Sequence, residues 1–207
     1  MTRSPSADGP GANAPRLVVG IVGPSNIGKT SLLERLIPAL AARGLSVAAV
    51  KHSSHGFIAD RPGKDSHRLY TAGAAAVALI SREQLATFTR REAAAEEGVS
   101  LEAALAGLPG GLDVVLAEGF SWEPIPRVVL RAGADEPPRA HVESGEVIEV
   151  VRLPGTADGE RPHLPDALID SLAQTLATRA EGPDRGRTLD GPTVAAGSMD
   201  GGRSSSG

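Results

Sequence analysis

Apolar positions along the chain fall into short continuous runs that alternate with stretches of helical spacing. Residues 17–23 (LVVGIVG) form an uncharged run that ends in glycine, which is typical of a strand buried on both faces of a parallel sheet. Apolar residues at intervals of three and four within residues 29–43 predict a helix, with Gly44 as its C-cap. The run at 46–52 predicts a second strand, so that these three elements form a right-handed crossover unit.

The remaining pattern predicts further strands and helices. Residues 75–80 and 112–117 predict two more buried strands, residues 85–90 indicate an edge strand, and residues 99–106 a short helix. Two later runs, PRVVLRAG and GEVIEVVRL, predict strands, and PDALIDSLAQTLATRA predicts a final helix with Pro165 near its start. This alternation predicts a three-layer α/β/α fold with a mostly parallel sheet.

The two ends of the chain differ from this pattern. Residues 1–15 and 181–207 are rich in Gly, Pro, Ser and Asp and offer little to bury, so we expect flexible tails around one folded domain at 16–180. The chain has 207 residues, and a hydrophobic content of 41% is sufficient for one core. Only 2% of residues are aromatic, so the core must be mainly aliphatic.

Charge and composition exclude several classes of protein. The net charge of −4 and the lack of a long basic run argue against nucleic acid as a partner. The sequence has no cysteine, which excludes disulfides and thiolate metal sites and fits a reducing cytoplasm. Because no uncharged apolar stretch approaches the roughly 18 to 20 residues of a membrane span, we expect a cytoplasmic protein.

The strongest chemical signal is GPSNIGKT at residues 23–30, which matches GxxxxGK[ST] between a predicted buried strand and a predicted helix. In such a loop the backbone amides of residues 26–29 converge on phosphate oxygens, and the helix N-terminus adds positive potential. Lys29 would reach the β- and γ-phosphates, and Thr30 would bind Mg²⁺. The motif and its context therefore predict a P-loop NTPase fold that binds GTP or ATP with magnesium.

Such sites need an acidic residue at the end of a neighbouring strand, to bind the magnesium directly or through water. Asp113 and Glu118 flank the predicted strand at 112–117. Asp113 lies at the strand's start, whereas Glu118 follows it, at the edge of the sheet where ligands of open α/β folds bind. We therefore favour Glu118 as the metal-binding and catalytic carboxylate, together with Lys29.

A second polar cluster, KHSSHGFIADRPGKDSHR, follows the second predicted strand. The sequence has three lysines against 18 arginines, and Lys29, Lys51 and Lys64 all fall in this cluster or in the loop. An ammonium is a compact donor that a guanidinium does not replace, so this bias indicates a chemical requirement. Two histidines of the cluster, His52 and His55, are candidates either for metal binding or for hydrogen bonds to an anionic ligand or to loop backbone. Asp65 fits a helix start, with a magnesium role as the alternative.

The ordered set of KHxxH, DxPGKDS, AGA and a strand ending in EGF resembles the family of molybdopterin-guanine dinucleotide biosynthesis protein B (MobB). The resemblance implies a GTP-binding protein, usually a homodimer with weak GTPase activity at most. Such a protein assists the guanylyltransferase that attaches GMP to the molybdenum-bearing pterin, so an anionic pterin ligand is also expected. The residues onto which the resemblance carries the family motifs are Gly23, Ser25, Asn26, Gly28, Lys29, Thr30, Ser31, Lys51, His52, His55, Asp60, Gly63, Lys64, Asp65, Ser66, Glu118 and Gly119. Ile27 is expected to bind phosphate through its backbone amide.

The chain departs from this family pattern in two places. After the EG pair the family often carries a basic residue, whereas this chain has Phe120, Ser121 and Trp122. No NKxD motif follows the later strands, so guanine preference rests on the resemblance alone. Other functions compatible with the loop are a metallochaperone GTPase and a small-molecule kinase, and a pure interaction module is an alternative from a different class.

Overall fold

The computed structural model describes residues 14–53, 56–58, 60–90, 100–133, 145–153 and 162–182. Most of the two predicted tails, residues 1–13 and 183–207, therefore lies outside the described residues. No helix within the described ranges is long and apolar enough to cross a membrane.

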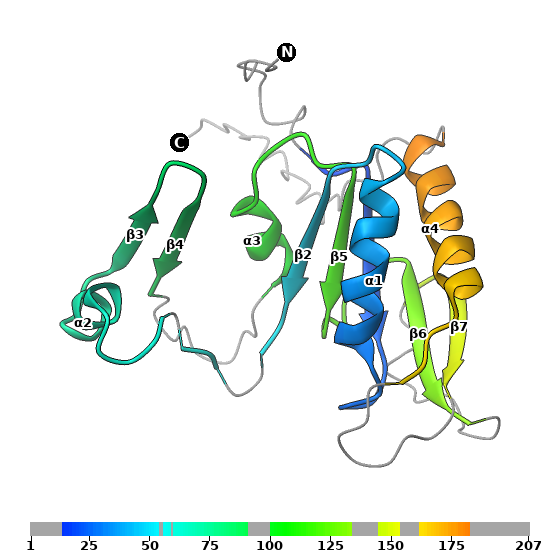
Figure 1. Cartoon of the computed structure of the whole chain (residues 1–207), viewed down its shortest axis with the longest axis horizontal. Coiled ribbons are helices and arrows are strands. Elements are labelled where there is room, and N and C mark those ends of the chain that lie inside the picture. The colour runs from blue at the N-terminus through cyan, green and yellow to red at the C-terminus, as the bar shows by residue number, and fades with distance from the viewer. Residues whose placement is uncertain are drawn as a thin grey trace, which may run out of the picture.

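Five parallel strands form the main sheet in the order β2-β5-β1-β6-β7 (Figure 1). The strands are β1 (Leu17–Val22), β2 (Val47–Lys51), β5 (Val114–Glu118), β6 (Arg127–Ala132) and β7 (Val147–Leu153). The continuous apolar runs of β1 and β5 fit their place inside the sheet, where both faces are covered. β1 is central, as predicted, and all five residues of β5 are buried. This order confirms the α/β fold class and brings the ends of β1, β5 and β2 to one edge.

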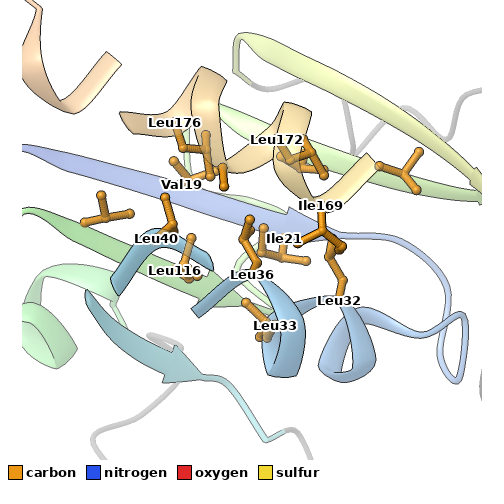
Figure 2. Packing of buried hydrophobic residues seen from close by; sticks show 14 of the residues in the cluster. Val19, Ile21, Leu32, Leu33, Leu36, Leu40, Leu116, Ile169, Leu172 and Leu176 are labelled. Atoms are coloured by element: carbon orange, nitrogen blue, oxygen red, sulfur yellow. The ribbon is translucent and has the colours of Figure 1, made fainter. Parts of the chain in front are cut away.

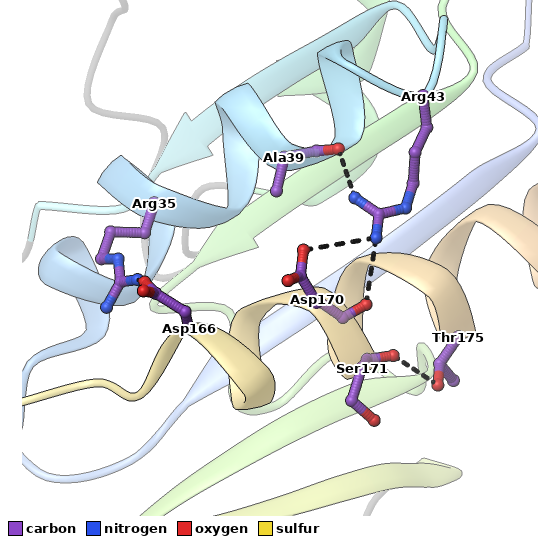
Figure 3. Close-up of polar contacts among 7 residues, drawn as sticks. All are labelled: Arg35, Ala39, Arg43, Asp166, Asp170, Ser171 and Thr175. Carbon is purple, nitrogen blue, oxygen red and sulfur yellow. Dashed lines mark hydrogen bonds and ion pairs between the residues drawn. The ribbon is translucent and has the colours of Figure 1, made fainter.

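Two helices, α1 (Lys29–Ala41) and α4 (Asp166–Glu181), lie together over one face of the sheet (Figure 1). Their apolar stripes meet the sheet in an aliphatic core, as Figure 2 shows. Members of this core include Val19, Ile21, Leu32, Leu36, Leu40, Leu116, Ile169, Leu172 and Leu176. Polar contacts join the exposed sides of the two helices, where Arg35 pairs with Asp166 and Arg43 lies 3.5 Å from Asp170 (Figure 3). The helix predicted at 29–43 thus forms, and Gly44 follows it with a φ of +82°.

The opposite face carries the short helix α3 (Leu101–Ala106), which begins after Ser100, whose hydroxyl accepts a hydrogen bond from the amide of Ala103. Its buried Leu101 packs with Ala117 of β5 and with Phe120 beyond it. Within the described residues the third layer therefore consists of this one helix, which covers the part of the sheet behind the ends of β5 and β2.

Residues 56–58 and 60–90 form an extension that we call the arm. It contains α2 (Asp65–Thr71) and a hairpin of β3 (Ala76–Ile80) and β4 (Leu85–Thr89), which Figure 1 shows apart from the main sheet, beyond its β2 edge. The expectation of a buried strand at 75–80 is wrong, because β3 pairs only with β4 and just one of its residues, Val77, is buried. The strand predicted at 85–90 forms as β4.

Candidate phosphate-binding site

The loop between β1 and α1 has a backbone that depends on its glycines. Gly23 has a φ of +152°, and a Cβ there would lie 2.6 Å from the carbonyl oxygen of Leu130 on β6. Gly28 has a φ of +102° as the N-cap of α1, and a Cβ would collide with Pro162. Asn26 is also left-handed, with a φ of +59°. Such alternation of backbone conformations turns successive amides toward one side, which is the geometry of an anion-binding nest.

The loop offers donors and holds one cation. Within the described residues, the amides of Asn26, Ile27 and Gly28 donate no hydrogen bond to the protein, so they remain available to a ligand. The Lys29 ammonium lies across the loop and donates to the carbonyl oxygens of Gly23 at 3.1 Å and Pro24 at 2.5 Å. Burial lowers the pKa of Lys29 and nearby Lys51 lowers it further, while Glu118 opposes both effects.

Three polar side chains from α1, β5 and β2 meet next to the loop. The Thr30 hydroxyl lies 3.1 Å from Oε2 and 3.3 Å from Oε1 of Glu118. The Lys51 ammonium lies 3.0 Å from Glu118 Oε1 and 3.3 Å from the Thr30 hydroxyl. Strand register explains the meeting, because Glu118 pairs with Ile21 of β1 on one side and with Lys51 of β2 on the other. The structure thus brings together three candidates, Thr30, Lys51 and Glu118, that are far apart in the sequence.

Thr30 and Glu118 have the donor chemistry and spacing that a magnesium ion needs. Magnesium binds oxygen ligands at about 2.0–2.1 Å in an octahedron, so neighbouring ligand oxygens are about 2.9 Å apart. The 3.1 Å between the Thr30 hydroxyl and Glu118 Oε2 is close to that spacing. No group of three or more His, Asp or Glu side chains suited to a metal occurs among the residues that the structure describes. A magnesium ion bound by Thr30 and Glu118 would take its remaining ligands from phosphate and water.

The alternative carboxylate, Asp113, lies at the other end of β5. Its Oδ2 accepts a hydrogen bond from the Ser46 amide at 2.8 Å, and its Oδ1 pairs with Arg16 at 3.1 Å. Asp113 therefore joins the entry of β5 to the start of β2, as expected of a strand-entry residue, and only Glu118 faces the loop.

His52 lies beside the site in a cluster of rings. Its amide donates to the carbonyl oxygen of Glu118 at 2.9 Å, and its ring makes edge contacts with Phe120 and Trp122. The sequence analysis missed this cluster, because it treated the residues after Gly119 only as a missing basic contact. Trp122, the single tryptophan of the chain, was the signal that could have indicated it. His55 lies outside the described residues, so both interpretations of the two histidines, hydrogen bonding to an anionic ligand or loop backbone and metal binding, stay predictions.

Lys64 and Asp65 lie in the arm rather than beside the phosphate loop. Lys64 directly precedes α2, and Asp65 begins the helix and lies 3.4 Å from Arg68. The start of α2 is held by Asp60, which accepts a hydrogen bond from the Ser66 hydroxyl. Figure 1 shows α2 far across the β2 edge from α1. Both candidates therefore lie at the start of α2, where the Lys64 side chain makes no capping hydrogen bond.

Known proteins resemble this chain across the loop, the sheet and the arm. The sequence model of the family described as Molybdopterin guanine dinucleotide synthesis protein B (MobB) matches residues 18–152. A molybdopterin-guanine dinucleotide biosynthesis adapter protein of Escherichia coli (strain K12) is 41% identical over 128 residues, which cover 61% of this chain and 72% of that protein. Its Haemophilus influenzae counterpart is 43% identical over 114 residues, or 55% of this chain and 62% of that protein.

Solved structures agree with the sequence comparison. A crystal structure of molybdopterin-guanine biosynthesis protein B (mobB) aligns with a TM-score of 0.55 at 30% identity, over 80% of this chain and all of that chain (100%). The crystal structure of Bacillus subtilis MobB aligns with a TM-score of 0.51 at 25% identity, over 77% of this chain and 97% of that one. The match of the family model over more than half of the sequence, supported by these structures, shows that the chain belongs to the MobB family.

Proposed function

We propose that this chain binds GTP with Mg²⁺ at the loop between β1 and α1 and serves as an accessory protein in molybdopterin guanine dinucleotide synthesis. The observation that carries the proposal is the meeting of Lys29, Thr30, Lys51 and Glu118 beside three free loop amides. Membership of the MobB family supports the biosynthetic role, because its relatives are named as adapter proteins of that synthesis.

Each side chain has a distinct part in this proposal. Thr30 and Glu118 hold the magnesium ion, which neutralises charge on the β- and γ-phosphates. Lys29 leaves its loop carbonyls and donates to the same phosphates. Lys51 lies at the γ-phosphate end and adds a second positive charge. The sequence contains no evident arginine finger or water-orienting glutamine, so we expect slow hydrolysis of GTP in the absence of a partner.

Calorimetric titration with GTP and Mg²⁺ tests the nucleotide part of the proposal. We expect saturable binding that weakens without Mg²⁺, and weaker binding of ATP under the same conditions. A flat GTP trace would leave only the interaction-module alternative. Co-purification tests the accessory role: the tagged chain, expressed in the cytoplasm of its native host, should retain the guanylyltransferase. Retention that is lost with the Gly28→Arg variant would tie the partnership to the nucleotide site.

The arm supplies a contact surface for the homodimer that we include in this proposal. Large hydrophobic side chains that are more than a third exposed cluster there: Phe57, Ile58, Leu69, Leu79, Ile80 and Leu85. Ile80 and Leu85 are cross-strand partners at the hairpin's end, with 83% and 69% of their surface exposed. A concentration of exposed apolar side chains on an element that packs little on its own domain is typical of an interface. A second copy of the arm provides the same surface.

Light scattering coupled to gel filtration tests this interface. The wild-type chain should elute as a dimer, and Leu85→Glu should shift the mass toward the monomer because it places a charge in an apolar contact. Gln174→Glu adds the same charge on the exposed side of α4 and should leave the mass unchanged. A dimer that persists unaltered in Leu85→Glu and in Ile80→Glu would locate the interface elsewhere.

A further inference from the structure

We propose that Trp122, backed by His52 and Phe120, is a stacking platform for the planar heteroaromatic ring of a second, anionic ligand. The inference rests on the proposed function, because the orientation of the bound triphosphate decides which ligand can reach these rings. We call the three residues the ring cluster.

In the ring cluster, Phe120 is buried and Trp122 is partly exposed to solvent. The His52 and Trp122 rings meet edge to face, with centroids 5.0 Å apart and an interplanar angle of 87°. Phe120 lies 5.8 Å from His52 and 5.7 Å from Trp122 and is only 1% exposed. Trp122 itself is 48% exposed. The whole chain has five Phe, Tyr and Trp residues, so placing two of them here is a marked concentration.

The ring cluster lies at the γ-phosphate end of the proposed nucleotide site. Thr30 and Glu118 mark the β- and γ-phosphates, because the magnesium ion of a phosphate loop binds there. His52 follows β2, and a Cβ on Gly119 would be 3.3 Å from the His52 Cβ, so the backbone that carries the rings lies next to the residue that follows Glu118. In the strand order, β2 lies on the opposite side of β5 from β1, β6 and β7. A ring stacked on Trp122 therefore belongs to a different molecule from the nucleotide, beyond its terminal phosphate.

The backbone that carries Trp122 is held in place before any ligand binds. The fully buried Arg127 donates to the carbonyl oxygens of Ser121, at 3.1 Å, and Glu123. The Glu123 carboxylate accepts a hydrogen bond from the amide of Leu101 at 3.2 Å, which ties the same turn to α3. A turn fixed on both sides of Trp122 loses little conformational entropy when a ring stacks on it.

The chemistry of the neighbourhood defines the ligand class. Stacking on indole requires a flat π-system, and the Lys51 ammonium, whose side chain is 58% exposed, provides a counter-charge for an anionic group. A fused nitrogen heterocycle that carries a phosphate or carboxylate, such as a pterin, has both features. Loss of one aromatic stacking partner costs such ligands roughly 10- to 100-fold in affinity.

The single tryptophan gives a direct readout, because the intrinsic indole fluorescence of the full chain reports on this position alone. We would titrate pterin-6-carboxylate in the presence of saturating Mg²⁺ and GTP, with free N-acetyltryptophanamide correcting for light absorbed by the probe. We expect saturable quenching. By calorimetry, Trp122→Ala and Trp122→Leu should both lose about 10- to 100-fold in affinity for the probe, whereas Trp122→Phe should keep most of it. The loss in Trp122→Leu separates stacking from simple hydrophobic contact.

Magnesium tripolyphosphate serves as the reference ligand for the phosphate loop. If it and GTP bind normally but the probe does not bind, or binds Trp122→Ala as well as wild type, the stacking inference is overturned and the proposed function stands. If neither GTP nor tripolyphosphate binds, the proposed function fails and takes the inference with it. Quenching by a purified guanylyltransferase but not by the probe would also overturn it, in favour of a protein-docking role for Trp122.

Discussion

Removal of the Lys29 ammonium is the most direct test of the phosphate loop. In the structure this group donates to the carbonyl oxygens of Gly23 and Pro24, so it is already positioned over the loop. Burial lowers its pKa, Glu118 opposes this effect, and the charge of Lys51 lowers the pKa further, so that the net shift is downward. The net effect of these surroundings is to disfavour the charged ammonium. A bound phosphate would therefore relieve an existing cost, and Lys29→Ala removes that gain.

The magnitude follows from the contacts exchanged. Hydrogen bonds to charged groups contribute roughly 1.5–3 kcal/mol each, and an ammonium that bridges the β- and γ-phosphates makes two. On binding, Lys29 gives up two hydrogen bonds to neutral carbonyls, each worth about 0.5–1.5 kcal/mol. The net loss in Lys29→Ala should be about 2–3 kcal/mol, which corresponds to roughly a 30- to 150-fold weaker affinity.

Calorimetry with two ligands checks this reasoning. The loss should be equal for magnesium GTP and magnesium tripolyphosphate, because Lys29 contacts phosphate and not the base. Arg16→Ala removes a positive charge at the opposite end of the sheet, where Arg16 pairs with Asp113, and should change neither affinity. Thermal melting without ligand verifies that both variants are folded. Wild-type affinity in Lys29→Ala, or a loss seen with GTP but not with tripolyphosphate, would refute the assignment.

Three further predictions concern metal binding, pH and packing. In titrations with and without the metal, Mg²⁺ should increase the GTP affinity of Glu118→Gln by a factor about 10 to 100 times smaller than in the wild-type chain. An equal increase in both proteins would exclude Glu118 as a magnesium ligand. Arg179 holds the pKa of Glu146 below its ordinary 4.5 through a hydrogen bond, so the pair stabilises the fold above that pH and the effect is lost as pH falls through the lowered pKa. Glu146→Gln should therefore lower the free energy of unfolding by less than about 1 kcal/mol at pH 7, because the pair is half-exposed, and melting curves of the two proteins should converge in acid. Leu36→Ala, at a fully buried position, should cost about 2–5 kcal/mol in urea unfolding, against about 0.5 kcal/mol or less for the exposed Gln174→Ala.

The main sheet could be predicted from the sequence because burial on both faces leaves a strong local pattern. The runs that became β1 and β5 have no charge until their ends, and the helix at 29–43 has a clear apolar stripe. The run AVALI gives the same local signal, yet it became β3, a strand with most of its residues exposed. An apolar run indicates that a segment favours burial. It does not indicate whether the surface that buries it belongs to the same domain or to another molecule.

The same holds for the site: one of its contacts could be predicted from the sequence, and another depended on how distant segments pair. Thr30 and Glu118 could be paired from topology alone, because parallel strands end at a common edge. The contact of His52 with Trp122 depends on the pairing of β2 with β5, which the sequence analysis did not predict, so the single tryptophan could have drawn attention to this region but not to its partner. Lys64 shows the converse: it is close to Lys51 in the sequence, but it lies at the start of α2 in the arm.

The charge balance around Glu118 suggests how metal and ligand binding are coupled. Without a metal, Lys51 neutralises this carboxylate at 3.0 Å, in a position where the carboxylate is only 8% exposed. A magnesium ion that binds Glu118 carries two positive charges and repels the ammonium from the same oxygen. Lys51 has an exposed side chain and can swing toward the nearest anion, which is the γ-phosphate or the acidic group of a ligand on Trp122. Magnesium would thus do more than bind the nucleotide, because it would also release the cation that the second ligand requires.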